Sequence, residues 1–163
     1  MRNLAVEQML ESLKGKSVVE QLRERGIGAL KKRHYPDTFN ARGQLTPFTT
    51  PAGYMTIEVN ARDPFEEWLM TVGHELGHTF VYGIPQDDEV VPFELWPKLT
   101  KRERRLLKKS LDWRVNAYIG YKHERSEEKL CERFAEAWLK QGSNRHELEE
   151  LLQQLVEREK VYL

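Results

Sequence analysis

The chain has 163 residues, of which 39% are hydrophobic and 32% are charged, and its 26 Lys and Arg balance 26 Asp and Glu. This composition predicts one folded domain, residues 1–163, around a single hydrophobic core. A net charge of zero gives no overall attraction to nucleic acid, so we do not expect direct nucleic-acid binding. No apolar run approaches the ~18 residues that cross a membrane, so we do not expect an integral membrane protein.

The N-terminus and the cysteine content indicate a compartment. Residues 1–10 lack the apolar centre of a signal peptide. The single cysteine, Cys131, has no second cysteine with which to form an internal disulfide. Both features predict a protein of the reducing cytoplasm.

The N-terminal third is expected to contain helices, then loop, then a strand. Residues 3–25 predict one or two helices, interrupted at Gly15 and Gly26. Residues 34–53 contain three prolines and two glycines and predict loop or short strands. Residues 54–60 alternate between apolar and polar side chains, which predicts a half-buried strand. The apolar face of that strand consists of Met55, Ile57 and Val59.

A helix is expected from about Pro64 to about Tyr82. Asp63 is a candidate N-cap, Pro64 suits the first helical position, and Gly83 is a typical stop. At about 100° per residue, one stripe of the helix is apolar and predicts a core-facing side. The stripe consists of Phe65, Leu69, Val72, Leu76 and Phe80.

The C-terminal half is expected to be a loop followed by three helices. Residues 84–99 predict the loop, and a helix from Thr100 contains the basic run 101–109, which we interpret as a solvated helix face. The second helix is expected from Ser126 to near Gly142, and the third begins at Asn144. The whole pattern predicts an α+β domain that is rich in helix, with a small sheet ahead of the 64–82 helix.

The 64–82 helix carries a candidate metal site. His74 and His78 are four residues apart, so their side chains lie one above the other on a helix, away from the apolar stripe. Two imidazoles that meet at one point can bind zinc. Glu75 lies on the flank, where it can reach a water bound to the metal, which is the arrangement H-E-x-x-H of metallopeptidases. The alternative is a pair of ordinary surface histidines.

Two glycines accompany the histidines. Gly73 and Gly77 each cost about 1 kcal/mol of helix stability relative to alanine. Two such costs in adjacent turns indicate that another backbone, or a substrate, approaches this helix closely.

The helix that covers residues 127–139 is the expected source of a third ligand. Its small residues Cys131 and Ala135 would allow it to approach the glycines, and Glu128 beside them is the candidate ligand. Glu132, one turn later, could accept a hydrogen bond from the other nitrogen of a ligating histidine. Glu136 belongs to a charged face and is not a candidate. The alternative is that acidic residues gather here because the helix dipole favours them.

The segments "HELGHTF" and "EEKLCERFA" resemble the ImmA/IrrE-type metallopeptidases. The resemblance covers roughly residues 54–82 and 126–139. It implies a zincin-like fold of the gluzincin kind, with His74, His78 and Glu128 as zinc ligands and Glu75 as the catalytic base. It also implies cleavage of an intracellular protein, often a repressor or other regulator.

The sequence therefore predicts a zinc metalloendopeptidase, a hydrolase, with Zn²⁺ as its cofactor and a protein or peptide as its substrate. In this mechanism Glu75 takes a proton from water and later returns it to the leaving amine. The alternative is a non-catalytic zinc-binding module for regulation or protein interaction on the same fold. The physiological metal, the oligomeric state, the need for an activator and the oxyanion-stabilising residue stay open. Candidates for that last role are Tyr118, Tyr121 and His123.

Overall fold

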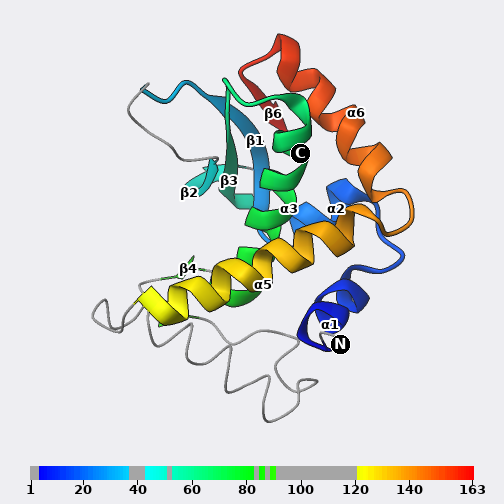
Figure 1. Ribbon diagram of the computed structural model, residues 1–163. Helices are drawn as coiled ribbons and strands as arrows, with labels where there is room; N and C mark the ends of the chain where they lie inside the picture. The colour runs from blue at the N-terminus through cyan, green and yellow to red at the C-terminus, as the bar shows by residue number, and fades with distance from the viewer. Residues whose placement is uncertain (1–3, 37–42, 51–52, 83–84, 87–88, 91–120) are drawn as a thin grey trace.

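The computed structural model describes residues 4–36, 43–50, 53–82, 85–86, 89–90 and 121–163, and shows a mixed α+β fold (Figure 1). The helices are α1 (Leu4–Leu13), α2 (Val18–Glu24), α3 (Phe65–Tyr82), α5 (Tyr121–Leu139) and α6 (Asn144–Glu157). The strands are β1 (Ile27–Arg33), β2 (Gly43–Thr50), β3 (Gly53–Asn60), β4 (Pro85–Gln86), β5 (Glu89–Val90) and β6 (Lys160–Tyr162).

Four strands form a sheet in the order β2-β3-β1-β6. β3 pairs antiparallel with β2 and parallel with β1, and β1 pairs antiparallel with β6. β3 is therefore an interior strand, and the prediction that it is buried on only one face is wrong. Its polar residues are as buried as its apolar ones, and on this face the side chains of Arg33 in β1 and Gln44 in β2 contact the carboxylate of Glu58. The polar residues of β3 are Thr56, Glu58 and Asn60.

β2 forms the edge of this sheet beside α3. Pro47 lies within β2 opposite Met55, and proline is tolerated in edge strands because no neighbouring strand needs its missing N–H. At Gly43 a Cβ atom would lie 2.3 Å from the main-chain oxygen of Glu58 and 2.4 Å from Cγ2 of Thr71. The start of β2 thus comes too close to β3 and α3 for any side chain larger than hydrogen.

Most of the predicted helices are confirmed, with shifted ends. α1 and α2 are separated as expected near Gly15, which has φ +79°, and α2 ends before Gly26, which has φ +85°. α5 begins at Tyr121, five residues before the predicted start at Ser126, because nothing in the intervening residues breaks a helix. β1 and β6 were not predicted, and the short pair β4 and β5 lies in the predicted loop.

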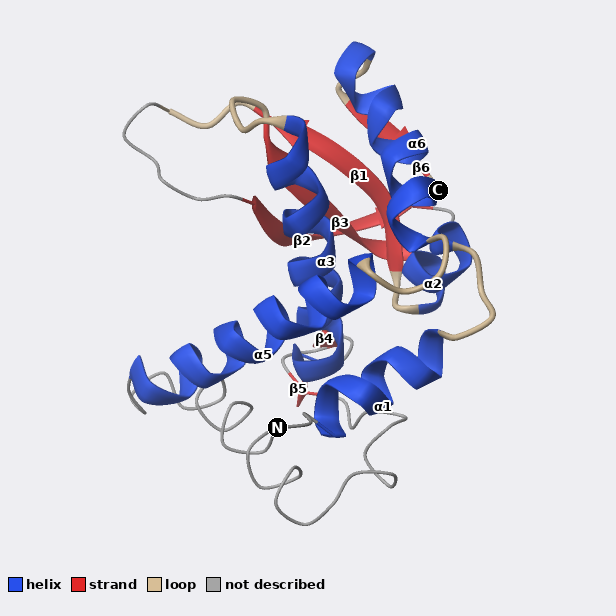
Figure 2. Ribbon diagram, turned by 45° about the vertical axis from the view of Figure 1, so that its right-hand side comes forward, coloured by secondary structure: helices blue, strands red, loops and turns tan. Residues whose placement is uncertain are grey.

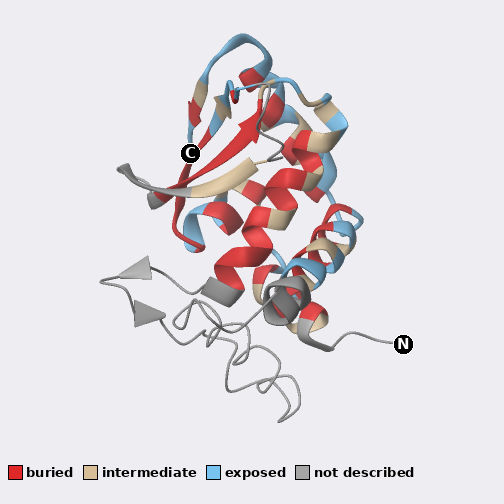
Figure 3. Cartoon of the chain, turned by 60° about the vertical axis from the view of Figure 1, so that its left-hand side comes forward, coloured by how far each residue is buried: buried red, intermediate tan, exposed pale blue. Residues whose placement is uncertain are grey.

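The core lies between the sheet and the helices, where Figure 3 shows the buried residues gathered. Four of the five residues of the predicted apolar stripe of α3 are in the core, since Leu69, Val72 and Leu76 are fully buried and Phe80 is 2% exposed. Phe65, at the start of the helix, is only partly buried. Among the described residues, none of the helices combines the length and apolar character that crossing a membrane requires. The predicted helix from Thr100, with its basic run, lies outside the described residues.

α5 crosses α3 in close contact at the two glycines (Figure 2). A Cβ atom at Gly73 would lie 2.9 Å from Cβ of Ala135, and one at Gly77 would lie 3.2 Å from Cα of Cys131. Ala135 and Cys131 are fully buried. The prediction that a second backbone approaches these glycines is therefore confirmed, and that backbone is α5.

A buried polar network fixes the other end of α5. Trp138 donates its indole N–H to the side chain of Gln21 in α2 at 2.7 Å. Asn144, at the start of α6, accepts a hydrogen bond from Gln21 and donates one to the main-chain oxygen of Trp138. α6 begins at Asn144 as predicted, and Ser143 occupies its N-cap position. Asn144 joins α2, α5 and α6.

The close helix contact predicts the effect of Gly73→Ala. Alanine favours a helix by about 1 kcal/mol over glycine, but overpacking costs about 1–3 kcal/mol. We expect the free energy of unfolding to fall by about 1 kcal/mol, measured by urea denaturation. The same change made in an Ala135→Gly background should be neutral or stabilising, because the opposing methyl group is gone. If Gly73→Ala stabilises both backgrounds, the contact is not tight.

Candidate metal centre

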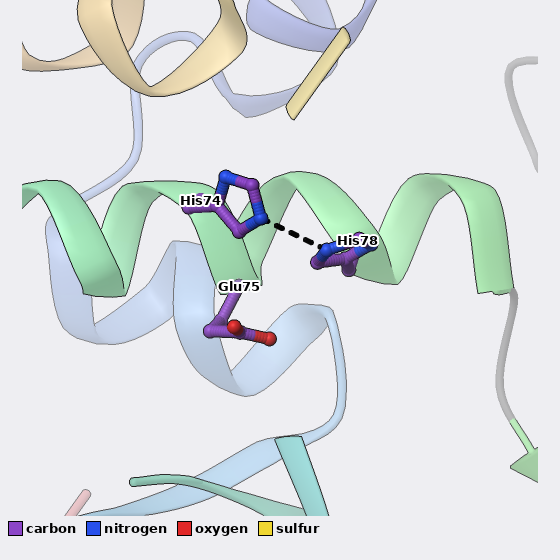
Figure 4. A group of neighbouring side chains, drawn as sticks. All are labelled: His74, Glu75 and His78. Carbon is purple, nitrogen blue, oxygen red and sulfur yellow. Dashed lines mark hydrogen bonds between the residues drawn. The ribbon is translucent and has the colours of Figure 1, made fainter. Parts of the chain in front are cut away.

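His74 and His78 lie next to each other on α3 (Figure 4), on the side where Glu128 of α5 contacts them. Their Nε2 atoms are 3.0 Å apart, and the two rings are arranged edge to face. The His78 side chain is 4% exposed and the His74 side chain is 14% exposed. Such burial does not fit the alternative of two ordinary surface histidines, because solvated side chains would be accessible.

α5 brings Glu128 to both histidines. Its Oε2 lies 2.7 Å from Nε2 of His74, and its Oε1 lies 3.1 Å from Nε2 of His78. Two atoms bound to one tetrahedral zinc ion at about 2.0–2.1 Å lie about 3.3 Å apart. The three donor groups therefore stand close to the spacing that a zinc ion requires, and two imidazoles with one carboxylate are a donor set of catalytic zinc sites.

Glu75 lies on another flank of α3, away from the line between the two histidines (Figure 4). One of its carboxylate oxygens and a ring nitrogen of each histidine all lie within 4.8 Å of one another, so Glu75 could also be considered a metal ligand. Glu128 fits that role better, since its contacts of 2.7 and 3.1 Å reach both Nε2 atoms at once.

The two carboxylates have opposite electrostatic surroundings. Burial raises the pKa of Glu75, and the charges of His78 and His74 and a hydrogen bond from the Leu45 N–H only partly oppose this. Burial would also raise the pKa of Glu128, but its hydrogen bonds to His74 and His78 outweigh burial and hold that pKa well below its usual value. Glu128 is thus stabilised as an anion, as a ligand must be, and Glu75 binds a proton more readily than an ordinary glutamate.

Glu132 lies behind His74, as the sequence suggested. Its Oε1 is 3.1 Å from Nδ1 of His74, although the two groups are not aligned for a hydrogen bond. The Glu132 side chain is 44% exposed, so a small rotation could align it. A carboxylate in this place orients a ligating imidazole and raises its basicity. Glu136 is exposed on the charged face, as predicted.

Two contacts of the site were not predicted from the sequence. Cys131, which is fully buried, makes a hydrogen bond with His78, and burial raises the pKa of its thiol. Leu45 in β2 donates its main-chain N–H to Glu75. A main-chain donor leaves no signature in a sequence, whereas the sequence had already placed Cys131 beside Glu128, and only its contact with His78 is new. Tyr118 and the side chains of Tyr121 and His123 lie outside the described part of the chain.

Comparisons with protein-family models, with curated proteins and with solved structures give no match for this chain.

The geometry predicts that removal of Glu128 weakens zinc binding far more than removal of Glu136. Both residues are glutamates of α5, but only Glu128 contacts the histidines. We expect Glu128→Ala to lower zinc affinity by more than about 100-fold, which exceeds the effect of an outer partner, and Glu136→Ala to leave it unchanged. Competition with a chromophoric chelator measures both. Equal affinities in the two variants would contradict the assignment.

Glu132→Ala should have an intermediate effect. An outer carboxylate behind a ligating histidine typically contributes about 10–100-fold to metal affinity. The same chelator competition should therefore rank Glu132→Ala between the other two variants. A loss as large as that of Glu128→Ala would mean that Glu132 binds the metal itself.

Proposed function

We propose that this protein is a zinc-dependent metalloendopeptidase with a zincin-like fold. The observation that carries the proposal is the buried carboxylate of Glu75, which stands beside the group formed by His74, His78 and Glu128 but is not needed to complete it. A purely structural zinc site usually has four protein ligands and no separate base. The resemblance of the two helical motifs to the ImmA/IrrE-type metallopeptidases supports the same proposal.

The ligand residues and the base have separate tasks. His74, His78 and Glu128 would hold the zinc ion, and Glu132 would orient His74. When bound, zinc supplies a Lewis acid that polarises a peptide carbonyl and makes water more acidic. Glu75 accepts a proton from the attacking water and returns it to the nitrogen of the leaving amine. The raised pKa of Glu75 suits both steps, because the same group must bind and release a proton.

The substrate is proposed to be a peptide segment in extended conformation. β2 is the edge strand beside α3, so one side of its main chain does not pair within the sheet. An extended peptide can add to such an edge through main-chain hydrogen bonds. The Leu45 N–H is not available for this pairing, because it is donated to Glu75, and Pro47 has no N–H, so a peptide would pair through the remaining main-chain groups of this edge. β3, the strand formed by Gly53–Asn60, cannot take this role, because it is paired with β2 and β1. The family resemblance extends the proposal to an intracellular protein, such as a repressor or other regulator.

Glu75→Gln tests the proposed chemistry. The amide keeps the shape of the side chain but cannot accept the proton, so we expect cleavage to fall about 10²–10⁴-fold or more. Zinc content, measured by elemental analysis, should stay near that of the parent because Glu75 is not a ligand. Cleavage is measured by comparing new peptide N-termini in a cell extract treated with each protein. Glu136→Gln, an exposed glutamate of α5, is the matched control and should cut as the parent does.

The outcomes separate the two functions. A zinc-loaded Glu75→Gln variant that produces the same new termini as the parent contradicts the hydrolytic mechanism. If the parent, Glu75→Gln and His74→Ala all leave the extract unchanged while the parent binds zinc, the protein is the non-catalytic zinc-binding module.

A further inference from the structure

The outer edge of β2 has an N–H group at Leu45 that the sheet does not use. In an antiparallel pair, alternate residues turn their N–H and C=O groups away from the partner strand. Leu45 lies opposite Ile57 and Pro47 lies opposite Met55, in an unshifted register. Pro47 has no N–H to give to β3, so it fits a position whose N–H would point away from β3. Leu45 lies two residues earlier, so its own N–H also points away from β3.

This outward N–H is donated to Glu75. The carboxylate of Glu75 accepts a hydrogen bond from the main chain of Leu45, and Glu75 is 8% exposed. A buried carboxylate without a donor is costly, because it loses its hydration. The contact therefore compensates for the burial of Glu75 and links the edge of the sheet to the metal-binding helix.

β2 is held in place at this contact and just before it. Two residues before Leu45, a Cβ atom at Gly43 would lie 2.4 Å from Thr71, which is one turn before Glu75 in α3. The side chain of Leu45 itself is partly buried against the core. A donor on a strand that packs this closely is held in one position relative to α3.

We propose that Leu45, through its main-chain N–H, is the positioning residue for Glu75. The N–H engages the carboxylate and keeps it beside the two histidines, so that the carboxylate is oriented before a substrate arrives. The catalytic consequence rests on the proposed function, whereas the contact itself does not. Because this N–H belongs to the backbone, any residue except proline at position 45 could supply it. Position 45 is identified by its register in β2 and not by its side chain.

Amide hydrogen exchange of the full-length zinc-loaded protein, followed by NMR, tests the contact without any substrate. The Leu45 amide should be protected in the parent, although it faces away from β3. In Glu75→Ala its protection should fall about 10- to 100-fold, as expected for loss of a hydrogen bond to a charged group. Glu75→Gln keeps an acceptor oxygen and should retain most of the protection. The amides of Ile57 and Val59 in β3 are controls and should not change.

If Leu45 exchanges equally in the parent and in Glu75→Ala while the controls hold, the proposal is wrong. A second variant, Leu45→Pro, removes the N–H at a position with the same orientation as the natural Pro47. With fluorescein-labelled casein as the probe, we expect kcat to fall about 10- to 100-fold, the effect of a misplaced catalytic group, with KM and zinc content unchanged. In a Glu75→Gln background, Leu45→Pro should cause no further loss.

The kinetic and hydrogen-exchange measurements separate failure of the positioning role from failure of the proposed peptidase function. A Leu45→Pro variant with the kcat of the parent overturns the positioning role. If the parent cleaves neither labelled casein nor proteins of a cell extract, but the Leu45 amide still depends on Glu75, then the contact is supported and the proposed peptidase function is wrong.

Discussion

The contact between α3 and α5 at two glycines determines the geometry of the candidate site. Gly73 and Gly77 allow the backbone of α5 to pass within van der Waals distance of α3. Glu128 lies one turn from the contact in α5, and the histidines lie beside the glycines in α3. An added Cβ atom at either glycine would come closer to α5 than ordinary van der Waals contact, so a larger residue there would push apart the two helices that bring Glu128 to the histidines. The packing of α5 against α3 therefore explains why two glycines stand in this helix, and it offsets the helix stability that they cost.

The surroundings of the two glutamates in this site shift their pKa values in opposite directions. Glu75 and Glu128 both approach the histidines, yet the pKa of Glu75 is raised and the pKa of Glu128 is lowered. Burial dominates at Glu75, whereas at Glu128 the direct hydrogen bonds to both imidazoles exceed the effect of burial. A pair of carboxylates whose pKa values are driven apart is a common sign of separate roles, and it agrees with the proposal of a ligand at Glu128 and a proton acceptor at Glu75.

The sheet contributes to the site through its edge. β2 places the N–H of Leu45 against Glu75, and Gly43 lets β2 pack directly on α3. At the far end of α5, the network of Gln21, Trp138 and Asn144 connects α2, α5 and α6. α3, which carries the two histidines, is thus restrained by the sheet edge on one side and by an anchored helix on the other, which favours a candidate site that is preorganised rather than assembled on binding.

The sequence by itself determined the features that depend on local periodicity. Helical spacing placed His74 and His78 together, separated them from the apolar stripe of α3, and selected Glu128 and Glu132 from one face of α5, because a helix relates residues three and four apart without reference to the rest of the chain. Only the tertiary structure decided what depends on strand order. β1 reads as a short apolar run followed by charges, and nothing in residues 54–60 reveals that β3 has two neighbours. The hydrogen bond of Leu45 also belongs to this class, since a main-chain donor has no side chain for the sequence to record.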